Sequence, residues 1–338
     1  MVTLVVSTTT DPASSGPASA LLSMAAWSPG PSFQGVRSFV YGGVRLLQHD
    51  KSIVVEDDLD TRWEEATNES VDNVIFLSKH TAVSNRPALT VHPIGVPHLK
   101  EGEVPPQGGR PGWAAPPDPR MGPWIRLLKK IAESRNLIPE FEVTMEGTHH
   151  GPVTSKPTMF LEIGCDHVTL LNLNAGECAL VTHPICIIVG STLEYWKRED
   201  AAQLIWEGLG LGGGTAIGEW NRETENKKVL FGIGGGHYAP RHMDIIMKAN
   251  VWVGHLLSGY SLPMDDPGQL NAVSDPTSIG GTWKQSIRAA YEATEAAFPG
   301  GEIFAHLDQK SFKGWQKNAI TAFLEEQKIK IGKPNDFK

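Results

Sequence analysis

Cysteine, early basic residues and long apolar runs are all scarce in this sequence. It has three cysteines in 338 residues, Cys165, Cys178 and Cys186, and their odd number and lack of CxxC spacing argue against both a disulfide framework and a thiolate zinc site. No Lys or Arg precedes Arg37, whereas secretory signals and transit peptides need early positive charge. The strongest apolar run, ICIIVG at 185–190, is far shorter than the roughly 18 residues of a membrane span. We therefore expect a soluble protein of the cytoplasm, with the nucleus as a second location, and no membrane partner.

An excess of basic residues is also missing. The chain has 30 Lys and Arg against 38 Asp and Glu, a formal net charge of -8, which excludes a general nucleic-acid coat and gives no reason to expect DNA as a partner. Contact with RNA would need a local basic patch. Residues 310–338 offer one, with seven lysines against three acidic residues, and Arg126, Lys129 and Lys130 offer another. A solvated helix face is the alternative interpretation of both.

The hydrophobic pattern is that of a large α/β protein. Apolar residues make up 40% of the chain, which is ample for a buried core. The helical spacing of Trp124, Leu127, Leu128 and Ile131 predicts a helix from Met121, and similar spacing predicts two helices near the C-terminus. Short β-branched and apolar segments predict strands at 2–7, 73–79, 88–92, 140–146, 158–163, 229–233 and 302–306.

Strands that alternate with helices favour a layered α/β architecture with a mainly parallel or mixed sheet. We expect a three-layer α/β/α arrangement with a mixed sheet and a smaller α/β subdomain, closely packed together within residues 1–338. Residues 95–119 are rich in Pro and Gly and are predicted to form a long surface loop.

One segment looks foreign to this pattern. Residues 165–190 contain all three cysteines and no Lys or Arg, and they separate a predicted strand from a predicted helix at 197–208. Deleting them would leave a compact strand–turn–helix. We interpret the segment as an insertion, for which an unspliced intron in the gene model is one source. The alternative is an ordinary buried hairpin.

Histidines follow several of the predicted strands. His80 and His92 each end a strand, the pair His149 and His150 follows EFEVTMEGT, and His237 follows FGIGGG. A lone histidine is more often structural than a ligand, but parallel strands deliver their carboxyl ends to one edge of a sheet. We therefore expect these side chains to converge there.

Neutral imidazoles with one or two carboxylates suit Zn2+, which lowers the pKa of a bound water to about 7. The chain is accordingly predicted to bind zinc, with the number of ions left open. Adjacent residues in a strand point to opposite faces, so only one imidazole of the pair is expected to reach a given metal. The predicted metal ligands are His80, His92, His150 and Glu162, and the predicted catalytic residues are Glu146, His149, His150 and His237. Glu146 and Glu162 each suit either a ligand or a general base.

The glycine runs do not fit the common nucleotide-binding motifs. GLGLGGGTAIG at 208–218 lacks the Lys-Ser/Thr of a P-loop, and GIGGG at 232–236 is not a complete GxGxxG. The backbone amides of Gly234, Gly235 and Gly236 still suit a phosphate or an ester carbonyl. The absence of a GxSxG elbow disfavours a serine esterase.

Several of these segments together resemble a known family, the D-aminoacyl-tRNA deacylases of the archaeal and plant type. The resemblance spans nearly the whole chain in order, and the intervening 165–190 is its main departure. It is carried by FLSKH (76–80), PALTVHPIG (87–95), TMEGTHHGP (144–152), FLEIG (160–164), FGIGGGHYAP (231–240) and VGHLLSGY (253–260).

The resemblance implies hydrolysis of the ester that joins a D-amino acid to the 3′ end of tRNA, a zinc-containing site and a core like that of phosphorylase/hydrolase folds. The partner would be aminoacylated tRNA, whose phosphates Lys310 and its neighbouring lysines would contact, and we expect a monomer. A backbone wall of glycines against the L side chain would explain chiral selectivity. Two alternatives stay open: a zinc peptidase or amidohydrolase acting on small metabolites, and a non-catalytic RNA-binding protein.

Overall fold

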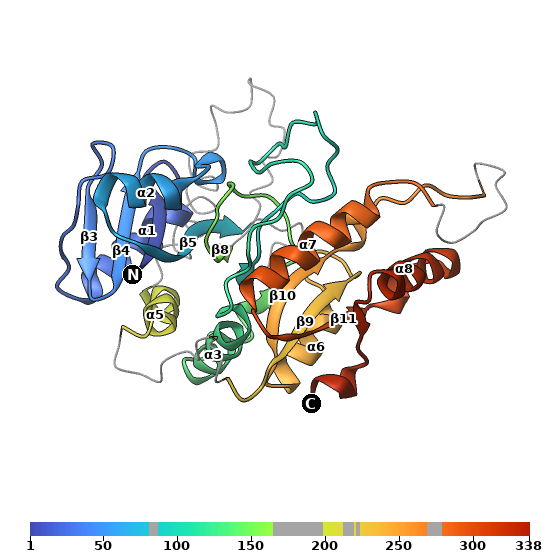
Figure 1. The fold of residues 1–338 in the computed structure, drawn as a ribbon. Helices are drawn as coiled ribbons and strands as arrows, with labels where there is room; N and C mark the ends of the chain where they lie inside the picture. The colour runs from blue at the N-terminus through green and yellow to red at the C-terminus, as the bar shows by residue number, and fades with distance from the viewer. Residues whose placement is uncertain (81–86, 165–198, 212–219, 221–223, 269–278) are drawn as a thin grey trace, which may run out of the picture.

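Two β-sheets organise the chain. The computed structural model describes residues 1–80, 87–164, 199–211, 220, 224–268 and 279–338, and Figure 1 shows its helices and strands. The suspected insertion at 165–190 lies outside the described residues. The large sheet has the order β2 (Ser28–Pro29), β3 (Ser38–Tyr41), β4 (Val44–His49), β1 (Val2–Thr8), β5 (Val71–His80), β8 (Thr158–Gly164), β6 (Ala88–His92) and β7 (Glu142–Met145).

Strand direction changes at three places in the large sheet, because β2 and β4 each run antiparallel to β3 and β6 runs antiparallel to β8. Strands β4, β1, β5 and β8 are parallel, because β-branched and apolar residues fill both of their buried faces. Strand β6 runs antiparallel to β8, with β7 parallel to β6, and β3 runs antiparallel to β4. The predicted mixed sheet is confirmed.

Both faces of the large sheet are covered. Helices α1 (Pro12–Met24), α3 (Met121–Ser134) and α5 (Glu199–Gly208) pack on one face around Leu21, Trp124 and Trp206. Helix α2 (Leu59–Thr67) and the segment that follows β6 cover the other face through Trp63 and Ala115. This gives the three layers that the sequence predicts.

The smaller sheet is all parallel, in the order β10 (Trp252–Leu257), β9 (Lys228–Ile233), β11 (Glu302–Leu307) and β12 (Lys330–Ile331). Helices α7 (Trp283–Ala297) and α8 (Gly314–Glu326) cover one of its faces. Helix α6 (Pro240–Lys248) and α3 cover the other, so α3 is shared by the two units (Figure 1). The expected fold class, with its second and smaller α/β unit, is confirmed.

Arg126 lies at this junction and is not a free cation. Its guanidinium donates to the carbonyl oxygens of Ile246 at 3.2 Å and Val251 at 2.8 Å. Burial lowers the pKa of Arg126 to about 10. The expectation that Arg126 is available to phosphates is therefore wrong, because this side chain ties α3 to the small sheet.

The Pro/Gly-rich segment 95–119 contains no helix and no strand longer than an isolated bridge, and part of it, including Val96 and Ala115, is buried. It packs against α7, where the side-chain amide of Gln285 donates to the carbonyl oxygens of Pro97 at 3.0 Å and Leu99 at 2.9 Å. Among the described residues, no helix is both long and apolar enough to cross a membrane.

Candidate metal centre

The candidate site lies on one face of the large sheet, over β8. Glu162 on β8 is flanked by Ser78 of β5 and Thr90 of β6. His80 and His92 each stand two residues further along those strands. Cross-strand neighbours share a face, so His80, Glu162 and His92 all project to the same side. Because β6 is antiparallel to β8, the ends of these strands do not meet at one edge. The expected common edge is wrong, and a shared sheet face replaces it.

A glycine makes room for the first of these imidazoles. Gly164 pairs with His80 across the sheet, and a Cβ atom at Gly164 would lie 2.6 Å from the Cβ of His80 and 2.8 Å from its ring. The missing side chain lets the His80 ring lie over β8, next to Glu162.

The adjacent pair His149 and His150 follows β7 in a loop rather than a strand. Strand β7 ends at Met145, and Gly151 turns the chain with φ +102°. The two ring centroids are 4.2 Å apart, and both rings also approach His92. The prediction that the pair diverges is wrong, because the alternation of a pleated strand no longer applies after Met145.

Three imidazoles form the first group of possible ligands, His92, His149 and His150, whose ligating atoms lie within 4.8 Å of one another. Nδ1 of His149 lies 2.7 Å from the carbonyl oxygen of Gly147, and Nδ1 of His92 lies 3.2 Å from that of Pro93. A carbonyl only accepts, so each Nδ1 carries a proton, and Nε2 is the ring nitrogen left to bind a metal. Backbone carbonyls commonly orient metal-binding histidines in this way.

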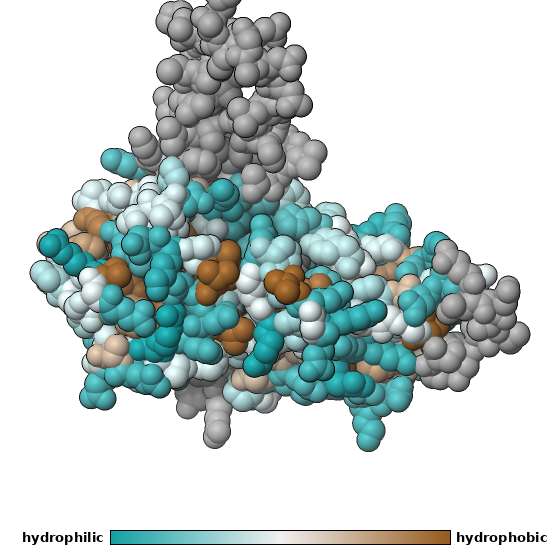
Figure 2. All heavy atoms as spheres, turned by 90° about the horizontal axis from the view of Figure 1, so that it is seen from above, coloured by the Kyte–Doolittle hydropathy of each residue, from teal (hydrophilic) through white to brown (hydrophobic). Residues whose placement is uncertain are grey.

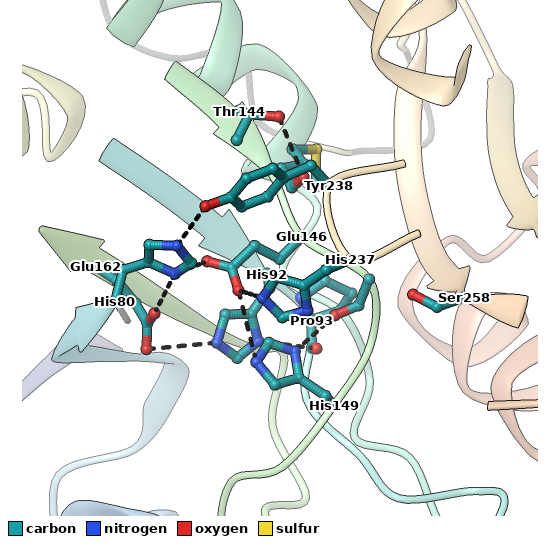
Figure 3. A network of polar contacts seen from close by, with 12 residues as sticks. His80, His92, Pro93, Thr144, Glu146, His149, Glu162, His237, Tyr238 and Ser258 are labelled. Carbon is teal, nitrogen blue, oxygen red and sulfur yellow. Dashed lines mark hydrogen bonds and ion pairs between the residues drawn. The ribbon is translucent and has the colours of Figure 1, made fainter. Parts of the chain in front are cut away.

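The second group consists of His80, Glu146 and His237 (Figure 3). Oε1 of Glu146 lies 2.9 Å from Nδ1 of His80, and Oε2 lies 2.5 Å from Nε2 of His237. On the far side of the His80 ring, the Tyr238 hydroxyl lies 2.6 Å from Nε2. His237 comes from the loop after β9, so the small sheet contributes directly to the site.

Glu162 stands between the two groups. One oxygen is 3.5 Å from Nδ1 of His80 and the other is 3.6 Å from Nε2 of His92. All four predicted metal ligands therefore do come together with the predicted catalytic residues. The geometry divides them differently, since His149 joins His92 and His150, whereas His80 joins Glu146 and His237.

The two carboxylates are buried and ionised. Burial alone would raise the pKa of Glu146, but the imidazoles of His237 and His80 hold that pKa well below its ordinary range. The pKa of Glu162 is also lowered, because His80 and His92 outweigh burial and the charge of Glu146. Burial would likewise lower the pKa of His80, but the two carboxylates raise it to about 10. Burial would lower the pKa of His92 too, but Glu162 raises it. The two buried carboxylates thus hold positive charge beside them, as they would with a bound cation.

The donor atoms fit a metal ion. Burial and the neighbouring His92 lower the pKa of His149 well below its ordinary value and that of His150 to about 3, so both rings are neutral, as ligands must be. Several buried atoms of the cluster have no hydrogen-bond partner: Nε2 of His92, Nδ1 of His150, Oε1 of Glu162 and both carboxylate oxygens of Glu146. The Glu146 oxygens do have nitrogen neighbours at short distance, but not at hydrogen-bond angles. Buried polar atoms without partners are unfavourable, and metal ions at the two groups would provide partners for the atoms of His92, His150 and Glu146.

A polar cavity of about 470 Å³ gives access to the cluster. Six of the site residues line it, together with hydroxyl and backbone groups from the end of β1 and the start of α1. The hydroxyl-bearing residues of its wall are Thr8, Thr10, Ser14, Ser52 and Ser78.

The glycine loop after β9 is firmly held. The Gly234 amide donates to the carbonyl oxygen of Leu257 and the Gly235 amide donates to the hydroxyl of Ser311, both at 2.7 Å. Their φ angles, +95° and +94°, suit glycine. Gly236 differs, because nothing lies within 4 Å of its Cβ position. Of the three predicted substrate-binding glycines, Gly236 alone leaves open space for a ligand.

Two tyrosines at the site were not predicted as functional residues, although both stand within the quoted motifs FGIGGGHYAP and VGHLLSGY. Tyr238 contacts His80, and the Tyr260 hydroxyl lies 3.3 Å from Nδ1 of His237. Lys310, the fourth predicted substrate contact, lies apart from the cluster and lines a second cavity with Arg241 and His306.

Comparison with known proteins gives one consistent result. A family model described as D-aminoacyl-tRNA deacylase matches residues 67–182 and 179–332. The chain is 63% identical to a D-aminoacyl-tRNA deacylase of Arabidopsis thaliana over 342 aligned residues, with all of both chains covered. It is 29% identical to a D-aminoacyl-tRNA deacylase of Aeropyrum pernix, over 97% of this chain and 98% of that one. A crystal structure described as conserved protein of unknown function AF0625 shares the fold, with a TM-score of 0.69 at 23% identity over 100% and 96% of the two chains.

Proposed function

Because this chain belongs to the D-aminoacyl-tRNA deacylase family, we propose that it hydrolyses the ester bond between a D-amino acid and the 3′ end of tRNA. Water attacks the ester carbonyl, the bond to the ribose oxygen breaks, and the products are the free D-amino acid and uncharged tRNA. Removal of D-amino acids from tRNA would act as quality control in translation.

The observation that supports this chemistry best is the buried cluster of five imidazoles and two carboxylates at the floor of an accessible cavity. Such a donor set suits zinc-assisted hydrolysis, and the described residues show no nucleophile elbow that would suggest a covalent route. Hydrolysis of an ester is also a modest demand, since the leaving group is a ribose hydroxyl.

Zinc is the cofactor we propose. His92, His149 and His150 would hold one ion through two Nε2 atoms and one Nδ1 atom, with Glu162 beside His92. His80, Glu146 and His237 offer a second position. When bound, zinc polarises a carbonyl oxygen and lowers the pKa of water.

The protein's own groups can move the proton. Glu146 holds the imidazole of His237 at 2.5 Å, and the His237 side chain is 38% exposed at the mouth of the site. With that second position unfilled, this pair would accept the proton of the attacking water and return it to the ribose oxygen as the ester bond breaks. The open backbone at Gly236 would contact the substrate next to the carbonyl, where an amide donor stabilises developing negative charge.

Selectivity for the D configuration requires more than an apolar pocket, since one methylene is worth only about 1–3 kcal/mol. The loop of Gly234, Gly235 and Gly236 is held by hydrogen bonds to Leu257 and Ser311. A fixed backbone wall of this kind would exclude an L side chain without selecting among D side chains.

The test is a deacylation assay with D-tyrosyl-tRNA and L-tyrosyl-tRNA, run beside small esters and dipeptides. We expect release of D-tyrosine and little release of L-tyrosine. Preferential cleavage of dipeptides or small esters would support the metabolite peptidase or amidohydrolase instead. Binding of tRNA without turnover of any substrate, in protein that contains zinc, would indicate a non-catalytic RNA-binding protein.

A further inference from the structure

Tyr260 is unusual among the aromatic residues. It lies in a short 3-10 helix (Gly259–Ser261) directly after β10, and its residue surface is 53% exposed. Within the described part of the chain, it is the only aromatic residue among the exposed large hydrophobic residues. Exposed aromatic rings are common at binding surfaces, because the ring offers a large contact area at little entropic cost.

The Tyr260 ring is held in place even though it is exposed. Its hydroxyl lies 3.3 Å from Nδ1 of His237. The backbone beneath it is anchored to the glycine loop, because the Gly259 amide donates to the carbonyl oxygen of Gly235 at 2.9 Å and the Ser258 hydroxyl donates to that of Gly236 at 3.1 Å. The hydroxyl is thus fixed at the active site, while much of the side chain remains open to solvent.

Tyr260 is placed to contact a part of the substrate that lies next to the reacting ester but does not react. The two nitrogens of His237 face opposite ways, with Nε2 toward Glu146 at 2.5 Å and Nδ1 toward Tyr260. Tyr260 is therefore separated from the reacting centre by the width of one imidazole, and it does not line the polar cavity. Under the proposed function the aminoacyl group would enter that cavity, so the group left outside, next to the ester oxygen, would be the terminal ribose and its base.

Basic residues continue the path away from the site. Gly235 is hydrogen-bonded to Gly259 on one side and to Ser311 on the other, so the segments of Tyr260 and Lys310 lie on either side of one glycine. Lys313 follows, and its ammonium lies 3.4 Å from a carboxylate oxygen of Asp266. An aromatic platform followed by cations is the pattern with which proteins bind single-stranded nucleic acid.

We propose that Tyr260 is a binding residue for tRNA, on which the 3′-terminal nucleobase stacks, with Lys310 near the phosphates that follow. This proposal rests on the proposed function, because it takes its ligand from the tRNA substrate. It adds a subsite for the terminal nucleotide, next to the centre that cleaves the ester.

A thermodynamic cycle tests the proposal through affinity rather than catalysis. Two uncharged tRNAs are compared, one with its complete CCA end and one that lacks the terminal adenosine, each with wild type, Tyr260→Ala and Tyr260→Phe. Stacking is worth about 1–3 kcal/mol per base by alanine substitution, so we expect Tyr260→Ala to raise the Kd of the complete tRNA roughly tenfold. Removal of the adenosine should weaken wild type by a similar factor and should weaken Tyr260→Ala no further. Tyr260→Phe keeps the ring and should stay within about twofold of wild type.

Two results would overturn the proposal. One is additivity, in which removal of the adenosine weakens Tyr260→Ala as much as it weakens wild type. The other is an equal loss of affinity in Tyr260→Phe and Tyr260→Ala, which would assign the effect to the hydroxyl at His237.

Lys310→Ala serves as the electrostatic control. Loss of a phosphate contact should reduce the slope of log K against log salt concentration by about one for either tRNA. If wild type hydrolyses D-tyrosyl-tRNA and the cycle is additive, the stacking proposal alone fails. If wild type shows the coupling but hydrolyses no D-aminoacyl-tRNA, the proposed function fails.

Discussion

Removal of the proposed zinc should destabilise the whole fold, and the size of the effect can be worked from the cluster. Five buried atoms of His92, His150, Glu146 and Glu162 have no hydrogen-bond partner. Each such atom is unfavourable by about 1–3 kcal/mol when it is left unsatisfied. These penalties overlap within one cluster, so their sum is an upper bound rather than an expectation.

Linkage gives a firmer magnitude. A ligand that binds only the folded state at about 1,000 times its Kd stabilises that state by about 4 kcal/mol. A domain of 150–250 residues gains about 2–4 °C in Tm for each kcal/mol, and a longer chain gains less per kcal/mol. For 338 residues, at about 2.1 cal/mol/K of unfolding entropy per residue, we therefore expect zinc-saturated protein to melt about 6 °C above protein treated with a chelator and then dialysed.

Thermal unfolding of both forms, followed by circular dichroism, measures this difference, and two variants show where it arises. Glu162→Gln removes a carboxylate from between the two ligand groups, so the shift on adding zinc should shrink. Glu56→Gln is the matched control, because Glu56 is also buried, pairs with Arg62 and takes no part in the cluster. It should lose stability but keep the full zinc shift. Equal Tm values for the two wild-type forms, or a full shift in Glu162→Gln, would refute the reasoning.

Three further predictions follow from single residues. Gly236→Ala should lower kcat/KM for D-tyrosyl-tRNA with little change in Tm, because open space surrounds its Cβ position. Gly234→Ala should instead lower Tm, because its Cβ would lie 2.6 Å from the Phe312 ring at a φ of +95°. A larger loss of Tm in Gly236→Ala than in Gly234→Ala, in paired kinetic and melting assays, would contradict the geometry. His237→Ala should lower kcat more than it raises KM, since the imidazole is assigned to proton transfer. Single-turnover deacylation by the zinc-loaded variant and by wild type separates the effect on the chemical step from the effect on binding. Burial lowers the pKa of His255 to about 4 in the folded state, so as the pH falls the unfolded state takes up this proton before the folded state does. This histidine should therefore contribute about 3 kcal/mol of stability above pH 6.5, which is lost progressively as the pH falls toward 4. Urea unfolding at pH 7.5 and 5 should show a weaker pH dependence in His255→Gln than in wild type.

Periodic segments were the predictable part of the fold. The strand at Ala88–His92 and the helix at Met121–Ser134 begin where the sequence pattern places them, because their apolar residues repeat with the period of the element. Helix α1 begins at Pro12, where the Asp11 side chain accepts the Ala13 amide as N-cap, a start that no hydrophobic period marks. Strands β3 and β4 and helices α2 and α6 were not predicted, since short elements with mixed polarity carry little periodic signal.

The members of the site were predictable as residue types, but their grouping was not. Histidines and glutamates close to strand ends suggested a metal centre, and His80, His92, His149, His150 and His237 do converge. Their division depends on facts that a sequence does not carry, namely that β6 runs against β8 and that β7 ends before the histidine pair. Strand direction is decided by long-range pairing, and the imidazole positions follow from it.

The division of the site between two sheets has a consequence for how activity depends on folding. The large sheet and the loop that follows β7 hold six of the seven cluster residues, and the small sheet supplies His237 through the loop after β9. The loop that follows β7 is hydrogen-bonded to the small unit at two points, because the Gly147 amide donates to the carbonyl oxygen of His237 at 2.7 Å and the Thr148 amide donates to that of Leu256, in β10, at 2.6 Å. A change that loosens the packing between the sheets would therefore move His237 away from Glu146 while His92, His149 and His150 stay in place. Metal binding should survive such a change better than hydrolysis does, which makes the ratio of bound zinc to deacylation rate a measure of how well the two sheets are docked.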